Sequence, residues 1–246
     1  MAEHEEVRAK VAQACRILAM TGLVKEITGH VSARVPGSDG EMYLRCRGDD
    51  EFGLPYTGAV AIQRVTLDGD SEVAPGNVLP IELPIHGEVL RAKPEMNCVV
   101  HAHPPYCLLC GMAGIELRPV YGAYDPSGIT IATQLKTYPR SILISSRELG
   151  EEVVRTMGDS SFALLRGHGI VVAGATIEEA TINAIRLENL AKTCWQLAQH
   201  GPLPEISAAD IEAFGGPTNP RVARGAEWVW RYYARLEESW TPTVVG

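Results

Sequence analysis

The sequence predicts an α/β fold in which one sheet lies between layers of helices, and three observations lead to this prediction. Apolar residues recur at every third or fourth position along several long segments, as on the buried face of a helix. Short runs of β-favouring residues that end near glycine or proline lie between these segments. The two kinds of segment follow one another in irregular order without an internal repeat, which favours a single sheet covered by helices.

Each helix is predicted from its apolar period and from the residues at its ends. Residues 4–21 have the helical period and stop at Gly22, and residues 81–93 lie between Pro80 and Pro94. The other predicted helices are 148–157, 177–200, 208–214 and about 221–238. The predicted strands lie within 27–37, where a glycine turn comes first, and at 42–46, 59–65, 99–102, 141–144 and 162–165. Residues 47–55 are polar and predict a loop.

The size and composition of the chain favour one domain. A chain of 246 residues with 46% hydrophobic and 21% charged residues can bury one large core. We therefore predict a single domain over residues 1–246, with a core from about 5 to 200 and a helical extension from about 201 to 246.

Charge and apolar patterning restrict the possible partners. The net charge of −8 argues against nucleic acid as the main ligand, because phosphate binding needs a basic face. No apolar run approaches the ~20 residues that span a bilayer, and the first residues are acidic with no apolar signal core. We expect a cytoplasmic protein that binds neither nucleic acid nor membranes, with its six cysteines reduced and mostly buried.

The segment with the strongest chemical signal is the predicted strand at 99–102, which runs into His101 and His103. Side chains two apart on a strand point to the same face, so both imidazoles can approach one metal ion. Pro104 and Pro105 then stop the strand, which leaves the two rings at its end.

Two further segments can complete such a site. His168 lies between Gly167 and Gly169, where the backbone can approach a neighbour closely, and it would make a three-histidine set with one coordination position open. Glu82 and His86 are four residues apart on the predicted helix 81–93, so they share a face. A carboxylate beside such a metal can transfer protons.

With these motifs in the same order and spacing, the chain resembles the class II aldolase/adducin family over roughly residues 10–200. The resemblance rests on four motifs: Gly29-His30-Val31-Ser32, Glu82-Leu83-Pro84-Ile85-His86, Val100-His101-Ala102-His103-Pro104 and Leu165-Arg166-Gly167-His168-Gly169. It implies a three-layer α/β/α fold around a central, mainly antiparallel sheet, and a homotetramer with active sites between subunits. It also implies that His101, His103 and His168 bind a divalent metal, with Glu82 as proton-transfer residue and sometimes a fourth ligand.

Departures from the family pattern bear on the substrate. Sugar-phosphate aldolases of the family have two serines before the glutamate and an asparagine in the glycine turn, whereas this chain has Pro80, Ile81 and His30. A phosphate pocket built from those side chains is therefore not expected. Arg45 and Arg47 flank one residue, so on a strand they would share a face, and their guanidinium groups suit carboxylates.

The arginines make the chain similar to the branch of the family that decarboxylates hydroxylated aromatic dicarboxylates, and a 3,4-dihydroxyphthalate-like acid is favoured over a hydroxymethylpyridine dicarboxylate. In the expected mechanism the metal chelates the departing carboxylate and the ring hydroxyl, Glu82 or His30 protonates the ring carbon, and Arg45 or Arg47 holds the other carboxylate. The metal is one Mn, Zn, Fe or Co ion per subunit. An aldolase or epimerase on a non-phosphorylated or sugar-derived substrate, and a non-catalytic adducin-like module, are the alternatives.

Other residues are weaker candidates for the site. Substrate contacts are also expected from Gly29, Ser32 and His86, and from Tyr121 or Tyr124, since family aldolases bring a tyrosine across the subunit boundary. Cys107 and Cys110 have C-x-x-C spacing, but no second such pair exists, so a buried helix turn is expected. The aromatic residues at 228–233 predict a packing helix, which could instead cover an aromatic pocket.

Overall fold

The computed structural model describes residues 2–49, 51–214 and 220–242, with no side chains described at 220–224. The longer helices are α1 (Ala2–Met20), α2 (Leu83–Ala92), α3 (Pro105–Ala113), α4 (Ser127–Gln134), α5 (Arg147–Met157), α6 (Ile177–Ala198), α7 (Ala208–Ala213) and α8 (Pro220–Ser239). The strands are β1 (His30–Arg34), β2 (Glu41–Arg45), β3 (Arg47–Gly48), β4 (Ile62–Thr66), β5 (Asn77–Val78), β6 (Cys98–Ala102), β7 (Lys136–Tyr138), β8 (Phe162–Leu165) and β9 (Gly169–Gly174). Short 3₁₀ turns η1 (Leu54–Tyr56) and η2 (Ala59–Ala61) precede β4.

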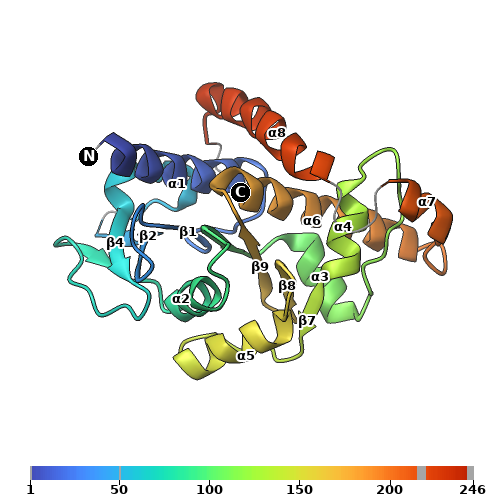
Figure 1. Cartoon of the computed structure of the whole chain (residues 1–246), viewed down its shortest axis with the longest axis horizontal. Coiled ribbons are helices and arrows are strands. Elements are labelled where there is room, and N and C mark those ends of the chain that lie inside the picture. Colours follow the sequence, from blue (N-terminus) through green and yellow to red (C-terminus); the bar gives the residue numbers. More distant parts are fainter. Residues whose placement is uncertain (1, 50, 215–219, 243–246) are drawn as a thin grey trace.

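A seven-stranded sheet in the order β4-β2-β1-β6-β9-β8-β7 forms the centre of the molecule. Every neighbouring pair is antiparallel except β7 and β8, which are parallel. Helices cover both faces, with α1, α6 and α8 on one side and α2 and α5 on the other (Figure 1). The prediction of an α/β fold with a mainly antiparallel sheet between helical layers is confirmed.

Alternation along the central strands assigns each side chain to one of two cores. Val31, Val100 and Val172 face the core made with α1 and α6, whereas Val99 and Val171 face the core made with α2 and α5. Residues of the opposite parity on β1 and β6, which include His30, Ser32 and His101, therefore lie on the α2 side of the sheet. This is the face on which the candidate site forms.

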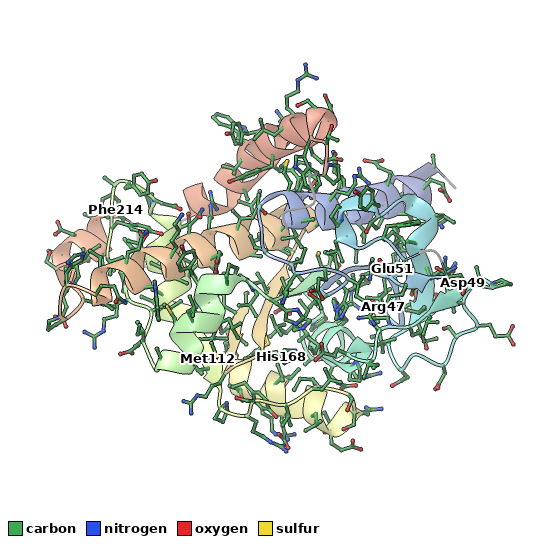
Figure 2. All side chains as sticks on the ribbon, turned by 180° about the vertical axis from the view of Figure 1, so that it is seen from behind. Arg47, Asp49, Glu51, Met112, His168 and Phe214 are labelled. Atoms are coloured by element: carbon green, nitrogen blue, oxygen red, sulfur yellow. The ribbon has the colours of Figure 1, made fainter. Side chains whose placement is uncertain are left out.

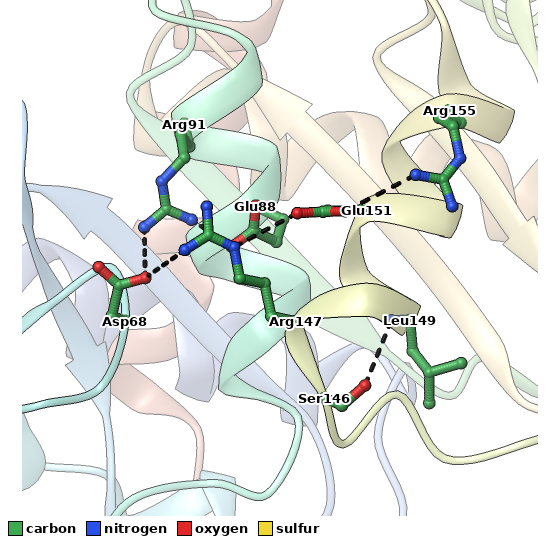
Figure 3. A network of polar contacts seen from close by, with 8 residues as sticks. All are labelled: Asp68, Glu88, Arg91, Ser146, Arg147, Leu149, Glu151 and Arg155. Atoms are coloured by element: carbon green, nitrogen blue, oxygen red, sulfur yellow. Dashed lines mark hydrogen bonds and ion pairs between the residues drawn. The ribbon is translucent and has the colours of Figure 1, made fainter.

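An ion-pair network fixes α2 against α5, as Figure 3 shows. Asp68 pairs with Arg91 of α2 at 2.7 Å and with Arg147 of α5 at 3.4 Å, and Arg147 also reaches Glu88 at 3.6 Å and Glu151 at 3.3 Å. The backbones pack closely as well, because a Cβ on Gly150 would lie 2.7 Å from the carbonyl oxygen of Pro84. Helix α2, which starts directly after Glu82, is thereby held in a fixed position.

Helix α3 begins two residues after His103, and its first turn is capped by a carboxylate from another helix. Glu188 of α6, which is buried, accepts hydrogen bonds from the backbone amides of Tyr106 at 2.8 Å and Cys107 at 2.9 Å. A carboxylate at this position satisfies unpaired amides and interacts favourably with the helix dipole.

Replacing Glu188 with alanine is expected to lower the free energy of unfolding by about 2 kcal/mol, because one part-buried and one buried amide would lose their acceptor. Urea denaturation monitored by circular dichroism measures this change. The exposed Glu95, which makes no ion pair within the described chain, is the control: Glu95→Ala should change stability by less than about 0.5 kcal/mol. Equal stability of the Glu188→Ala and Glu95→Ala variants would contradict the capping role.

Most predicted elements are present within one or two residues, but three predictions were wrong or incomplete. Residues 141–144 form no strand, and the edge strand is β7, three residues upstream. The segment after β7 instead contributes the backbone amide of Ile144 to the site described below. Helix α4 was not predicted, and the segment 47–55 contains the short strand β3 and the turn η1 rather than only loop. Two-residue strands lack a periodic signal, and in α4 (Ser127–Gln134) the two large apolar residues, Ile129 and Ile131, are two positions apart rather than three or four.

The C-terminal part packs partly on the main core. Trp230 of α8 is buried against the α1 and α6 core, while Trp228 and Tyr232 are exposed. The packing prediction is thus confirmed for Trp230, and the division into a core of 5–200 and an extension of 201–246 stays a prediction. None of the helices in the described part of the chain is long and apolar enough to cross a bilayer.

Candidate metal centre

Glu82, His101, His103 and His168 converge on one point at the end of β6. One ligand atom from each residue lies within 4.8 Å of all the others. Nε2 of His103 lies 3.0 Å from Nε2 of His101, and the two oxygens of Glu82 lie 3.2 Å from Nε2 of His101 and Nε2 of His168. The structure therefore brings together the complete ligand set that the sequence predicts. Figure 2 labels His168 at this place.

The local backbone explains why these side chains meet. Gly169 is the first residue of β9, and a Cβ there would lie 2.3 Å from the carbonyl oxygen of Ala102 and 2.7 Å from the ring of His103. Gly167 has a φ of +61°, which turns the chain between the paired strands β8 and β9 next to His168. The amide of His103 donates to the carbonyl of Leu23 at 3.0 Å, which fixes the end of the strand. The glycines flanking His168 are thus required by close packing.

Glu82 is the non-helical residue that precedes α2, and its carboxylate is buried between two imidazoles. Oε1 also accepts a hydrogen bond from the backbone amide of Ile144 at 3.1 Å. Burial opposes ionisation, but contact with the imidazoles of His101 and His168 outweighs it, and the pKa of Glu82 is held well below its ordinary value. The carboxylate is therefore an anion that can bind a cation or accept a proton.

The donor set fits a divalent metal. Nδ1 of His101 lies 2.9 Å from the carbonyl oxygen of Ile170, which can only accept, so Nδ1 carries the proton and Nε2 presents a lone pair. That lone pair faces Nε2 of His103 and an oxygen of ionised Glu82, and a cation at their centre would satisfy all of them. Three imidazoles and a carboxylate suit Zn, Mn, Fe or Co.

A second group of buried polar residues lies beside the cluster. His30, directly opposite His101 in the sheet, stacks on its ring with centroids 5.1 Å apart. Nδ1 of His30 lies 2.9 Å from Nε2 of His86, and Nδ1 of His86 lies 2.8 Å from Oγ of Ser32. Gly29, with a φ of +89°, precedes this chain, and a Cβ there would lie 2.8 Å from Val24. His86 thus contacts His30 and Ser32, while Glu82 contacts His101 and His168.

Burial makes this group sensitive to acid. Desolvation, then the neighbouring His101, lower the pKa of His86 to about 3, and desolvation holds the pKa of His30 well below its ordinary value. Between pH 6.5 and 3 the unfolded chain therefore binds protons that the folded chain does not bind, and stability falls as the pH falls. For His86 alone the loss at pH 5 is about 2 kcal/mol.

We expect the urea midpoint of the metal-free protein to fall between pH 7.5 and pH 5, and to fall less in a His86→Gln variant, which has no proton to bind there. Urea titrations at several pH values check this. Parallel pH profiles for the parent protein and His86→Gln would show that His86 does not contribute.

The structure separates the two arginines that the sequence places together. Arg45 ends β2 on the α1 side of the sheet, opposite the histidines, where it is buried in an ion pair with Glu51. Arg47 lies in β3, which pairs with β5 four residues before Glu82. The prediction of a shared strand face is therefore wrong, because the chain leaves the main sheet at Cys46, whose amide bonds to the carbonyl of Ala61 at 2.8 Å.

Arg47 has the properties expected of a residue that binds an anion. Its Nε is buried without a hydrogen-bond partner, and no ion pair of Arg47 occurs among the residues that the structure describes. In the view of Figure 2, Arg47 is drawn between Asp49 and His168. Asp50, the remaining acid of this loop, lies outside the described residues.

The predicted tyrosines are not part of the cluster within one chain. Tyr121 is half-buried against Tyr124 and Gly128, and Tyr124 is 88% exposed. Contact with a neighbouring subunit's site stays a prediction. All six cysteines are free and buried, and Cys107 and Cys110 lie in α3 as an ordinary helix turn.

Three backbone or ring groups of the site were not predicted. The carbonyl of Ile170 orients His101, the amide of Ile144 binds Glu82, and Nδ1 of His168 is buried with no hydrogen-bond partner in the described chain. Backbone groups carry no sequence signal of their own, so only the fold could reveal the first two.

Comparison with known proteins agrees with this geometry. Residues 9–195 match the model of the class II aldolase and adducin N-terminal domain. The chain belongs to the class II aldolase/adducin family. Its fold superimposes on an aldolase II superfamily protein from Pseudomonas syringae with a TM-score of 0.80, at 23% identity and covering 96% of this chain and 95% of that one.

Curated relatives point to one branch of the family. The chain is 38% identical over 247 residues to a protein named 3,4-dihydroxyphthalate decarboxylase from Arthrobacter keyseri, covering 96% of both chains. It is 40% identical over 214 residues to a protein of the same name from Rhodococcus jostii, covering 85% of this chain and 87% of the relative.

Proposed function

We propose that this protein is a metal-dependent carboxy-lyase that decarboxylates a hydroxylated aromatic dicarboxylate of the 3,4-dihydroxyphthalate type. The observation that carries the proposal is the intact Glu82–His101–His103–His168 cluster in a chain that matches decarboxylases of this name along almost its whole length. Pro80 and Ile81, at the positions of the family's phosphate-binding serines, support a substrate without phosphate.

His101, His103, His168 and Glu82 would hold one divalent ion per chain. When bound, such an ion polarises the carboxylate and ring-hydroxyl oxygens of the substrate. Glu82 is the proposed proton-transfer residue, because its carboxylate is buried, ionised and held at both oxygens. It accepts the proton of the ring hydroxyl and returns it to the ring carbon that carries the carboxylate; the C–C bond then breaks, CO₂ leaves, and the bonding electron pair restores the aromatic ring.

Arg47 is the proposed ligand of the second carboxylate. It lies beside the segment that leads into Glu82, and its guanidinium has an unpartnered buried nitrogen, whereas Arg45 is already paired with Glu51 on the opposite face. A guanidinium binds a carboxylate with two parallel hydrogen bonds, which orients the ring as well as attracting it.

Arg47→Gln is expected to raise KM for the dicarboxylate about 10- to 100-fold, because one charge-assisted contact is lost, with a smaller effect on kcat. Steady-state kinetics measure both constants. Arg155→Gln, which removes an exposed arginine of α5, is the matched control and should leave both unchanged. An unaltered KM in Arg47→Gln would remove Arg47 from substrate binding.

We also propose a homotetramer with sites between subunits, to which Tyr121 or Tyr124 of a neighbour contributes, and a cytoplasmic location. The family membership and the exposure of Tyr124 support the first of these, and the six free, buried cysteines support the second.

Incubation of metal-loaded protein with 3,4-dihydroxyphthalate, with CO₂ release and aromatic product as readouts, tests the proposed function. Non-phosphorylated sugar-derived aldols and L-fuculose 1-phosphate serve as competing substrates. Release of CO₂ from the aromatic acid alone is expected. Aldol cleavage without CO₂ release from any hydroxylated aromatic dicarboxylate would reject the proposal in favour of an aldolase.

A further inference from the structure

The buried chain Ser32–His86–His30 forms no part of the ligand cluster, although it lies against it. Its two hydrogen bonds, at 2.8 and 2.9 Å, join three side chains that are at most 4% exposed. Neutral imidazole has one donor and one acceptor nitrogen, so the direction of one bond fixes the direction of the next.

Ser32 determines this direction. Its hydroxyl is fully buried, and Nδ1 of His86 is its one hydrogen-bond partner among the described residues. If Nδ1 of His86 carried a proton, Ser32 would accept it and the serine's own proton would have no acceptor, which is costly in a buried site. The hydroxyl of Ser32 therefore donates to Nδ1 of His86.

The position of the proton on His86 determines its position on His30. With Nδ1 of His86 accepting, its proton is on Nε2, and this N–H donates to Nδ1 of His30. The proton of neutral His30 must then be on Nε2. This nitrogen has no hydrogen-bond partner in the described chain, and its ring stacks on that of the ligand-cluster residue His101 with centroids 5.1 Å apart.

We infer that Ser32 and His86 are positioning residues that fix His30 as a neutral N–H donor, and that Nε2–H of His30 donates a hydrogen bond to an anionic oxygen of the substrate at the metal centre. The identity of that oxygen, a carboxylate or ring oxygen, rests on the proposed function. The direction of the hydrogen bonds from Ser32 to His30 does not depend on it. His30 is thereby a binding and charge-stabilising group, and the proton transfer stays with Glu82. A neutral donor stabilises developing negative charge without giving up its proton.

Nitrogen-15 NMR of the histidine side chains in metal-free protein tests the direction of the chain without any activity. Assignment by comparison with His30→Gln and His86→Gln is expected to show both His30 and His86 protonated at Nε2. Ser32→Ala removes the group that sets the direction and should shift His86, and with it His30, toward protonation at Nδ1. His30 protonated at Nδ1 in the parent protein would overturn the inference, even if CO₂ release were observed.

Kinetics test the consequence for turnover. His86→Leu, which breaks the chain, should lower kcat/KM about 10- to 100-fold, whereas His86→Gln, whose amide can accept from Ser32 and donate to His30, should retain most of it. His30→Ala should lower kcat/KM about 100- to 1000-fold with metal content unchanged. His200→Gln, on the surface, is the matched control. Equal kinetics of His86→Leu and the parent protein would overturn the positioning role of His86. If the parent protein releases no CO₂, the proposed function is rejected, and the NMR experiment alone decides the direction of the hydrogen bonds.

Discussion

His168→Ala is expected to abolish turnover, by about a thousandfold or more, and to leave protein that retains little metal after dialysis. His168 is one of three imidazoles in the cluster, and its loss leaves two imidazoles and Glu82, whose carboxylate loses one of its two histidine partners. Metal analysis together with CO₂ release measures both effects. The fold should persist, because His168 lies in the turn between β8 and β9 with its side chain 13% exposed.

His200→Ala is the matched control for this variant, since it removes an exposed histidine at the end of α6. It should keep full metal content and full activity. A His168→Ala protein with the parent's metal content would show that His168 is not a ligand, and unchanged turnover would separate the cluster from the reaction.

Glu82→Gln is expected to lower kcat by about 10²- to 10⁴-fold, which is the contribution typical of a proton-transfer group, while sparing metal content. The amide oxygen of glutamine can still reach the ligand sphere and still accept from the amide of Ile144, but it does not exchange a proton with the substrate. Metal content and single-turnover rates distinguish the two functions of this carboxylate.

Exchange of Glu88, a buried glutamate of α2, for glutamine provides the comparison, since Glu88 belongs to the ion-pair network with Arg91 and Arg147 and not to the cluster. It should alter stability more than kcat. Full activity of Glu82→Gln would remove Glu82 from proton transfer.

The ligand set could be predicted from the sequence because each member carries a local signal. His101 and His103 share a strand face by parity, and the glycines around His168 indicate a close approach that the structure confirms, with Ala102 and His103 packed against Gly169. The helix that follows Glu82 could be bounded by its flanking prolines.

Features that depend on long-range pairing could not be predicted in this way. Arg45 and Arg47 look equivalent in the sequence, but β2 ends between them and places one in each of two sheets. Residues 141–144 have the composition of a strand, yet the amide of Ile144 binds a carboxylate that is 62 positions away. The Ser32–His86–His30 chain likewise joins two elements that only the fold brings together.

The dependence of CO₂ release on a divalent metal is the most direct test of the account. Protein stripped with a chelator and dialysed is incubated with 3,4-dihydroxyphthalate, and Mn, Zn, Fe or Co is then restored in stoichiometric steps. We predict no release from the stripped protein, and recovery that saturates at one ion per chain. Undiminished release from metal-free protein, or no release at any metal loading, would contradict the account.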